Sequence, residues 1–230
     1  MKITFIGGGN MAGALIGGLI QQGFDSGDIH VVETNADARA NLSRVFALNT
    51  HTKISEAAQT DLIVLAVKPQ HLREVAQELK PLLREQLIIS IAAGVRAQDL
   101  SRWLGGYARL VRAMPNTPAL VHAGVTGLFA MAAVSATQRE QAQKVMEAVG
   151  ACVWLVEEAQ MDAVTAVSGS GPAYVFYFIE ALESAALTLG SSWLWRASLA
   201  APKKVASANS RACAGLNPKV NAADSSASMK

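Results

Sequence analysis

The stretch Lys2-Ile-Thr-Phe-Ile6, followed directly by Gly7-Gly8-Gly9-Asn10-Met11-Ala12-Gly13, decides the fold class of this 230-residue chain. Its first half is an apolar run typical of a buried strand, and its second half is a glycine turn of spacing G-x-G-x-x-A that leads into a helix. Gly7 allows the tight turn, Gly9 allows a pyrophosphate to approach the backbone, and Ala12 lets the helix pack on the strand. The pattern predicts a dinucleotide phosphate cradle at the helix N-terminus, formed by Ile6, Gly7, Gly8, Gly9, Asn10, Met11 and Ala12.

A second apolar run, Ile29-His-Val-Val32, ends at Glu33, which lies 21 positions beyond the alanine of the glycine pattern. An acidic residue at this distance is expected to bind the adenosine ribose. Taken alone, the carboxylate of Glu33 favours NAD, because it would repel a 2′-phosphate. Thr34, Asn35 and Arg39 favour NADP if the loop turns their donors and positive charge towards a phosphate, while Arg39 also fits a solvated helix residue.

Strand and helix patterns alternate along the first 157 residues. Further strands are expected at 62–67, 87–91, 109–114 and 152–156, and helices at 36–46, 71–83 and 137–149. This alternation predicts an α/β fold with a Rossmann-type, doubly wound and mostly parallel sheet. Ligands of such sheets lie beyond the carboxyl ends of the strands, so the small residues that follow two of the strands are expected to converge on the glycine loop: Ala66, Val67, Lys68, Pro69, Ala92, Ala93 and Gly94.

The region from Glu157 to Leu189 is mostly helical in pattern, with an interruption at Ser168-Gly-Ser-Gly-Pro172. Proline suits the first turn of a helix, and serine is a good N-cap. The pattern therefore predicts that one helix ends here and that another begins, with Ser170 as its N-cap.

Composition narrows the class of protein. The chain is 51% hydrophobic with a formal net charge of +2, and residues 191–230 hold 6 of the 20 basic side chains but only 1 of the 18 acidic ones. The remaining, mildly acidic body argues against nucleic acid as a partner. Two distant cysteines and four scattered histidines predict neither disulfides nor a metal site, and they leave no histidine assigned to catalysis. The two distant cysteines predict a reducing compartment, and so a cytoplasmic protein. No apolar run approaches the roughly 20 residues of a membrane span, and no leader is expected.

Five motifs, in this order and spacing, are similar to those of the pyrroline-5-carboxylate reductase family, the last enzymes of proline synthesis. The resemblance covers about residues 1–190 and is carried by Phe5–Ala12, Ala66–Pro69, Ser90–Gly94, Arg112–Pro118 and Asp162–Tyr174. It implies that NADPH, or sometimes NADH, reduces 1-pyrroline-5-carboxylate to L-proline by hydride transfer to the C=N carbon. It also implies homodimers and larger rings. A cyclic imine that carries its own proton accepts hydride without a strong protein acid, and no catalytic residue is assigned.

By this resemblance, the glycine loop holds the pyrophosphate, while residues 66–69 and 92–94 line the adenosine and nicotinamide ends of the cofactor. Two roles fit Lys68, a cation near the dinucleotide or a strand-terminal lysine that binds nearby carbonyl groups. The substrate side would comprise Asn116, Ser168, Gly169, Ser170 and Gly171. For the two glycines, close packing of two helices is the alternative role.

The resemblance ends at Gly190. Family members continue into a helical domain that interlocks two subunits and contains a Ser-Pro-Gly-Gly-Thr-Thr loop for the substrate carboxylate, whereas residues 191–230 are rich in Ala, Ser, Lys and Asn. This composition predicts a disordered tail. A change of reading frame after codon 190 is favoured over a genuinely divergent tail. The expected organisation is a dinucleotide-binding domain at 1–157, the start of a truncated helical dimerisation domain at 158–190, and a divergent tail at 191–230.

Two functions of different class remain open on the sequence. The chain is either an active imine reductase or a truncated, inactive remnant that binds a dinucleotide. A β-hydroxyacid dehydrogenase is less favoured, because such an enzyme is expected to carry a catalytic lysine on the interdomain helix and there is none between Glu157 and Leu189.

Overall fold

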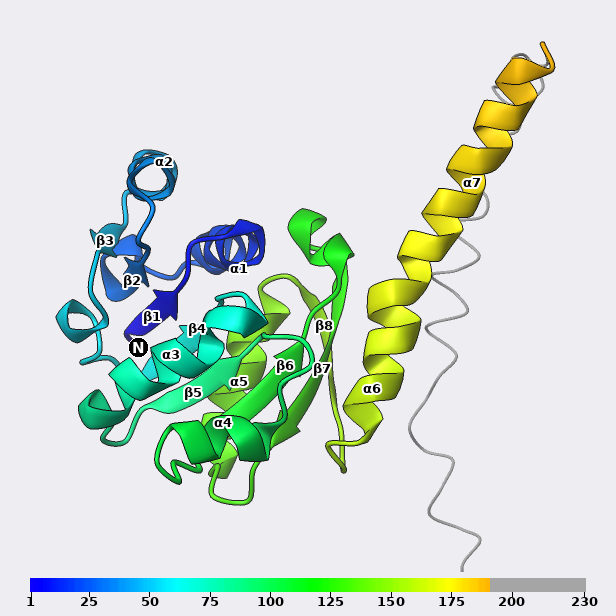
Figure 1. Ribbon diagram of the computed structural model, residues 1–230. Coiled ribbons are helices and arrows are strands. Elements are labelled where there is room, and N and C mark those ends of the chain that lie inside the picture. Colours follow the sequence, from blue (N-terminus) through cyan, green and yellow to red (C-terminus); the bar gives the residue numbers. More distant parts are fainter. Residues whose placement is uncertain (191–230) are drawn as a thin grey trace, which may run out of the picture. The chain divides into compact units, whose positions relative to one another are not determined.

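The computed structural model of the chain describes residues 1–190 (Figure 1). It divides into two compact units, of which the first is Met1–Ala173 and the second begins at Tyr174. The expected tail at 191–230 lies outside the described residues.

The first unit is built on one sheet of eight strands within the described residues, in the order β3-β2-β1-β4-β5-β6-β7-β8. Every neighbouring pair is parallel except β6 and β7, which are antiparallel. The predicted Rossmann-type, doubly wound and mostly parallel sheet is therefore confirmed. The strands are β1 (Ile3–Ile6), β2 (Ile29–Val32), β3 (Asn49–His51), β4 (Leu62–Leu65), β5 (Leu87–Ser90), β6 (Leu110–Met114), β7 (Gly124–Ala130) and β8 (Gly150–Trp154).

Helices cover both faces of this sheet (Figure 1). Alternate residues of the central strands point to opposite faces, so Leu62 and Val64 join one buried apolar cluster with α1 and α5, while Ile63 and Leu65 join the other with α3 and α4. The helices of the described residues are α1 (Asn10–Gln21), α2 (Ala36–Phe46), α3 (Pro69–Leu79), α4 (Ala97–Trp103), α5 (Ala136–Glu147), α6 (Gln160–Val164) and α7 (Gly171–Thr188).

Three elements of the first unit were not expected from the sequence, namely β3, β7 and α4. β3 is three residues long and polar, Asn-Thr-His, so it carries no apolar signal. β7 contains Gly124 and Gly127, which interrupt its apolar pattern. An added Cβ would lie 2.9 Å from the backbone at Ala119 Cα for Gly124, and 3.0 Å from the side-chain atom Val164 Cγ1 for Gly127.

The predicted helix break at Ser168–Pro172 is wrong. α6 continues through a π-helical turn, Thr165–Ser170, directly into α7. Pro172 has no N–H to donate, and a wider i→i+5 turn absorbs the interruption of the hydrogen-bond ladder without ending the helix. Ser170 is therefore not an N-cap, since it lies inside this turn, and Gly171 has helical backbone angles of φ −52° and ψ −50°.

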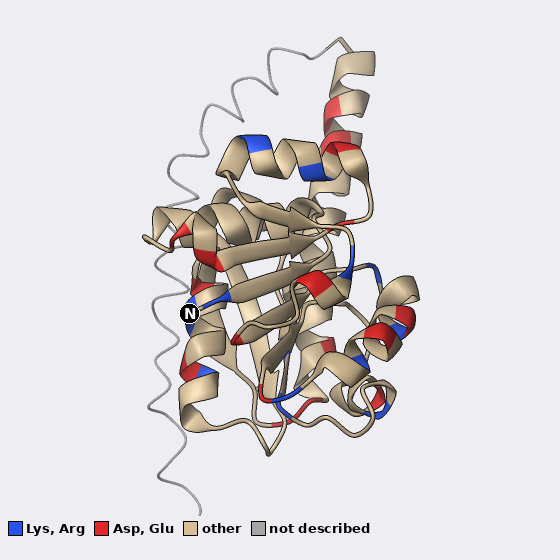
Figure 2. Ribbon diagram, turned by 90° about the vertical axis from the view of Figure 1, so that its left-hand side faces the viewer, with Lys and Arg blue, Asp and Glu red and all other residues tan. Residues whose placement is uncertain are grey.

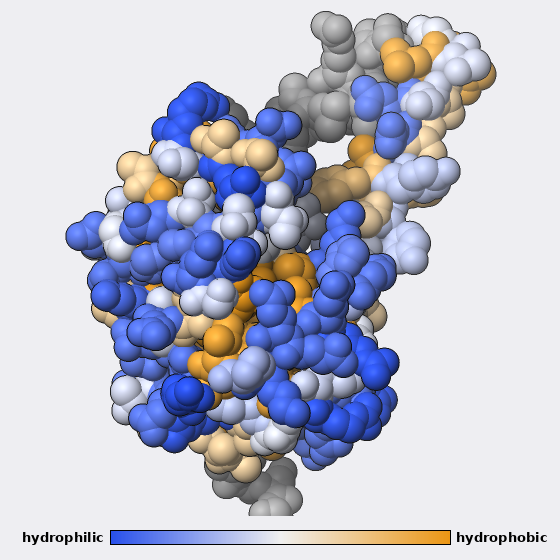
Figure 3. Space-filling model, turned by 60° about the vertical axis from the view of Figure 1, so that its left-hand side comes forward, coloured by the Kyte–Doolittle hydropathy of each residue, from blue (hydrophilic) through white to orange (hydrophobic). Residues whose placement is uncertain are grey.

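The surface of the first unit is mixed in charge and polarity. Acidic and basic residues are interspersed along its ribbon (Figure 2). Hydrophilic residues cover most of the face seen in Figure 3, and hydrophobic ones gather in a central area of that face. None of the helices in the described part of the chain combines the length and apolar character needed to cross a bilayer.

In the second unit, α7 exposes a row of aromatic residues. The exposed fractions of Phe176, Tyr177 and Phe178 are 68%, 74% and 64%. A large exposed apolar surface of this kind marks an interaction site.

Candidate active site

The carboxyl ends of four neighbouring strands lie at one level of the sheet. Ile6 of β1 pairs with Leu65 of β4, Leu65 with Ser90 of β5, and Ser90 with Arg112 of β6. The segments that follow these residues therefore emerge side by side at one edge. The sheet order reverses between β1 and β4, because β2 and β3 extend to one side and the later strands to the other. Such a switch point is where doubly wound sheets bind ligands.

Gly7 lies between the ends of β1 and β4. Its φ is +103°, and an added Cβ would lie 2.6 Å from the carbonyl oxygen of Ala66. Its N–H donates to the carbonyl of Val32 at 2.8 Å, which ties the turn to β2 as well. Only glycine combines this backbone conformation with this close approach.

Gly9 forms the N-terminal end of α1. It is the N-cap residue, with no side chain to satisfy the first N–H groups of the helix. No atom of the described residues lies within 4 Å of the position that a Cβ would take at Gly9. The helix N-terminus thus faces open space with free N–H donors and a favourable dipole, an arrangement that fits a pyrophosphate.

The carboxylate of Glu33 is bound to the backbone on both sides of it. Its Oε2 accepts from the N–H of Gly8 at 2.8 Å, and its Oε1 accepts from the N–H of Asn35 at 2.8 Å. Arg39 donates to the carbonyls of Glu33 and Thr34 at 2.7 and 2.8 Å. Glu33 therefore holds the glycine loop against the loop after β2. Arg39 stabilises the loop after β2 through its bonds to the two carbonyls. Thr34 is exposed beside them.

The other predicted cofactor residues follow β4 and β5. Pro69 opens α3, and the Lys68 before it is exposed, with no hydrogen bond or ion pair from its side chain among residues 1–190. Ala92 is buried, whereas Ala93 and Gly94 are exposed in a turn where Gly94 has a φ of +75°. Small residues thus line this part of the edge.

On the predicted substrate side, the structure brings the π-helical turn close to the end of β6. A Cβ at Gly169 would lie 3.5 Å from Met114 Cε, two residues before Asn116. Asn116 is 8% exposed, and its Oδ1 accepts from the N–H of Val125 at 2.9 Å. Ser168 is partly buried and its Oγ donates to the carbonyl of Val164 at 3.0 Å, while Ser170 is exposed. Asn116 therefore fixes the start of β7. Its side-chain amide nitrogen has no hydrogen-bond partner among residues 1–190.

Gly171, the first residue of α7, lies close to the backbone of the π-helical turn before it. A Cβ at Gly171 would lie 3.3 Å from the carbonyl oxygen of Ala166, one π-helical turn earlier. This close contact lies within one continuous helix and is not a contact between two helices.

Ionisable groups with shifted pKa values lie away from this edge. His30 Nδ1 is 3.1 Å from His51 Nε2 across β2 and β3, and the pKa of His30 is lowered by burial and then by His51 and Lys2, against an opposing effect of Asp28. Burial raises the pKa of Cys152 to about 12, with a further contribution from Glu147. No cluster of three or more His, Cys, Asp and Glu suited to a metal ion occurs among residues 1–190.

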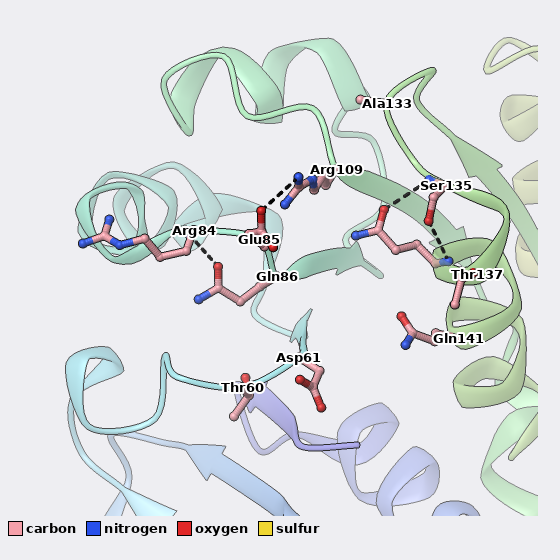
Figure 4. Close-up of a pocket in the computed structure, with 11 residues that line it drawn as sticks. Thr60, Asp61, Arg84, Glu85, Gln86, Arg109, Ala133, Ser135, Thr137 and Gln141 are labelled. Atoms are coloured by element: carbon pink, nitrogen blue, oxygen red, sulfur yellow. Dashed lines mark hydrogen bonds and ion pairs between the residues drawn. The ribbon is translucent and has the colours of Figure 1, made fainter.

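A hollow of about 600 Å³ lies at the opposite edge, before the amino ends of β4, β5 and β6 (Figure 4). Arg109 and Glu85 pair across it at 3.5 Å, and Ser135 and Gln138 bond to each other's backbone at the start of α5. The hollow is thus separate from the glycine cradle.

Sequence reasoning missed one ion pair near the candidate site. Arg112, buried on β6, donates to Glu158, which lies 46 residues further along the chain. Arg112 stood inside a recognised motif, but neither spacing nor composition signalled its partner.

A doubly wound sheet with an open glycine cradle at its switch point defines a class of protein, the dinucleotide-binding α/β oxidoreductases. Residues 2–94 match the family model described as NADP oxidoreductase, coenzyme F420-dependent. Residues 158–209 match the one described as pyrroline-5-carboxylate reductase dimerisation, a range that passes beyond Gly190.

Known proteins narrow this class to one family. The pyrroline-5-carboxylate reductase of Pseudomonas aeruginosa is 50% identical over 193 residues, covering 83% of this chain and 71% of that protein. The one from Haemophilus influenzae is 42% identical over 188 residues, covering 81% and 69%. The chain belongs to the pyrroline-5-carboxylate reductase family, and the resemblance seen in the motifs is confirmed.

Solved structures agree. The pyrroline-5-carboxylate reductase of Coxiella burnetii superposes with a TM-score of 0.79 at 41% identity, covering 89% of this chain and 79% of that one. The Plasmodium falciparum enzyme, solved with NADP bound, gives a TM-score of 0.75 at 29% identity, with coverages of 89% and 78%. The expected NADP cofactor is thereby confirmed for the family.

Proposed function

We propose that this chain catalyses the NADPH-dependent reduction of 1-pyrroline-5-carboxylate to L-proline. One observation carries the proposal beyond family membership: the open helix N-terminus at Gly9, the small residues after β4 and β5, and the turn beside Met114 all lie along one edge of the sheet. When bound, NADPH supplies the hydride for the C=N carbon.

The residues of this edge divide into two groups by what they offer a ligand. The free N–H groups at the start of α1 would hold the pyrophosphate, with Gly7 shaping the turn and Gly9 leaving it accessible. The backbone turn at Ala92–Gly94 would form a wall for the nicotinamide, because it follows β5, which lies two places from β1 in the sheet. Asn116 and Ser168–Gly171 would face the substrate, with no side chain required as a strong acid.

The contacts of Glu33 support NADPH over NADH as the preferred cofactor. Each oxygen of this carboxylate already accepts one backbone N–H, so its charge is partly compensated and its orientation is set by the two loops that it joins. Thr34 and Asn35 remain exposed at the turn, where they can donate to a 2′-phosphate. We infer that Glu33 braces the glycine loop, in place of the ribose-binding role expected from the sequence.

The chain divides into a cofactor-binding domain and the start of a dimerisation domain. We propose a dinucleotide-binding domain over residues 1–157 and the start of a helical dimerisation domain over 158–190. The start of the dimerisation match at residue 158 and the exposed aromatic row of α7 support this division and a homodimer. The partly buried thiol of Cys152, which forms no disulfide within residues 1–190, supports a reducing compartment, the cytoplasm.

The test is NADPH oxidation by the purified chain, followed by absorbance, with and without 1-pyrroline-5-carboxylate. Oxidation that depends on the substrate and yields proline supports the proposal. Folded protein that binds NADPH but gives no such oxidation refutes it and favours an inactive dinucleotide-binding remnant.

The cradle itself is tested by Gly9→Val. The added branched side chain would occupy the open space before α1, so NADPH affinity is expected to fall by at least about 100-fold. Gly23→Asn is the matched control, because Gly23 ends the same helix with a φ of +88° and an added Cβ there meets no atom of the described residues within 4 Å. Asparagine tolerates this conformation, so the control should bind NADPH like the unaltered chain. Unchanged affinity in Gly9→Val would refute the cradle assignment.

A further inference from the structure

A single carboxylate oxygen joins three elements next to the candidate site. Glu158 Oε1 accepts from Arg112 Nη1 at 2.9 Å and from the backbone N–H of Ala97 at 2.7 Å. Arg112 lies on β6, Ala97 begins α4, and Glu158 precedes α6. Glu158 thus links the sheet, the connection from β5 to α4, and the start of the helical segment.

The ion pair between Arg112 and Glu158 is mostly buried, so breaking it is costly. The side chains of Arg112 and Glu158 are only 5% and 19% exposed. Removal of either partner leaves a poorly hydrated charge behind, so the pair does not open readily. By contrast, Arg102 and Asp99 of α4 pair at 2.7 Å with side chains 73% and 41% exposed, a surface contact of little consequence.

Both sides of the proposed reaction site are attached to this link. The connection from β5 to α4 carries Ala92–Gly94, and Gly94 is three residues from Ala97. The helical segment beyond Glu158 packs on the sheet through Val164, which lies against Gly127, and reaches Met114 at Gly169. The glycine cradle, which follows β1, is held instead by the bonds of Gly7 to Val32 and of Gly8 to Glu33.

We propose that Glu158 and Arg112 are positioning residues, which fix the turn Ala92–Gly94 relative to the helical segment that carries Ser168–Gly171. The inference rests on the proposed function, since it assigns the nicotinamide to the first of these segments and the substrate to the second. A displacement of about 1 Å between two reacting groups can cost about 100-fold in rate. Loss of the link is therefore expected to slow hydride transfer far more than it weakens NADPH binding.

The experiment compares Glu158→Ala, Glu158→Gln and the control Asp99→Asn in the full chain. Glu158→Ala is expected to lower kcat for 1-pyrroline-5-carboxylate reduction by about 10- to 100-fold, with the Kd for NADPH changed less than about threefold. Glu158→Gln keeps an oxygen that accepts from Ala97, so it should recover part of that loss. Asp99→Asn should match the unaltered chain in both quantities.

A second readout does not require turnover. The emission spectrum of bound NADPH reports the surroundings of its nicotinamide, and we expect it to shift in Glu158→Ala and to stay unchanged in Asp99→Asn. If the unaltered chain binds NADPH without reducing the substrate, the proposed function fails while this spectrum still tests the link. A folded Glu158 variant with unchanged kcat, or with unchanged emission where turnover is absent, overturns the inference; Glu158→Gln takes this role if Glu158→Ala does not fold.

Discussion

Thr126, on β7, carries a buried hydroxyl without a hydrogen-bond partner. The residue is 1% exposed, and its Oγ1 finds no donor or acceptor among residues 1–190. A hydroxyl buried in this way costs about 1–3 kcal/mol relative to its hydrated state. Thr126→Val puts a methyl group of similar size in its place, and we expect the free energy of unfolding to rise by about 1 kcal/mol or more.

Thr4 provides a matched control. It is also 1% exposed and also lies on a buried strand, but its Oγ1 donates to the carbonyl of Ala57 at 2.6 Å. Thr4→Val removes this bond and leaves a buried carbonyl unsatisfied, which is expected to cost about 1–3 kcal/mol. The preference of valine for strands acts equally in both variants. The two substitutions should therefore differ by about 2–4 kcal/mol, with opposite signs.

Urea unfolding followed by far-ultraviolet circular dichroism measures both changes, at one protein concentration so that self-association affects all samples alike. The slope of the free energy against urea should be the same in the three proteins, because each exposes the same surface on unfolding. If Thr126→Val destabilises the protein as much as Thr4→Val does, the hydroxyl of Thr126 has a partner and the reasoning is refuted.

Two further predictions follow from the shifted pKa values. The pKa of His30 is lowered in the folded protein, so the unfolded chain binds more protons below about pH 6.5. The contribution of His30 to stability should therefore be complete above that pH and decline as the pH falls below it. His30→Gln should flatten this decline in urea unfolding measured from about pH 7.5 to 5, and an equal decline in both proteins would show that His30 is not its source. Because the pKa of Cys152 is raised from 9.0 to about 12, its thiolate should be about a thousandfold rarer than that of an ordinary cysteine. A Cys213→Ser chain should therefore react correspondingly slowly with a thiol reagent at about pH 8. Labelling at the rate of a free thiol would contradict the burial of Cys152.

The strands that the sequence predicted differ in burial: β1, β4 and β5 are buried throughout, whereas β8 has no buried residue. β1, β4 and β5 lie between helices on both faces and read as continuous apolar runs, so their pattern alone identifies them. β3 lies at the edge of the sheet and is polar. β7 contains two glycines but pairs with a strand on each side. Edge position and pairing are tertiary facts, which a local pattern does not contain.

The same distinction separates the two parts of the candidate site. The sequence signal of the glycine cradle is local, because the residues of its turn and helix start all lie within Gly7–Ala12, and their positions were predictable from spacing; the contacts of Gly7 with Val32 and Ala66 were not. The contacts of Glu33 with Gly8 and of Glu158 with Arg112 join residues 25 and 46 positions apart. The sequence identified Glu33 and predicted that its carboxylate binds the ribose, but its contacts with Gly8 and Asn35 were not predicted, because they depend on how two loops meet.

Pro172 shows that a strong local signal for a new helix does not always end the helix before it. A proline after a glycine-rich stretch predicts a new helix, yet the chain continues helically from α6 into α7 by widening one turn. The start of this segment is fixed to the sheet, since Met161 is fully buried and Val164 lies against Gly127, whereas no residue of the π-helical turn or of α7 is buried. The π-helical turn accommodates the proline, which has no N–H to donate, and it leaves Gly169 beside Met114 on the proposed substrate side.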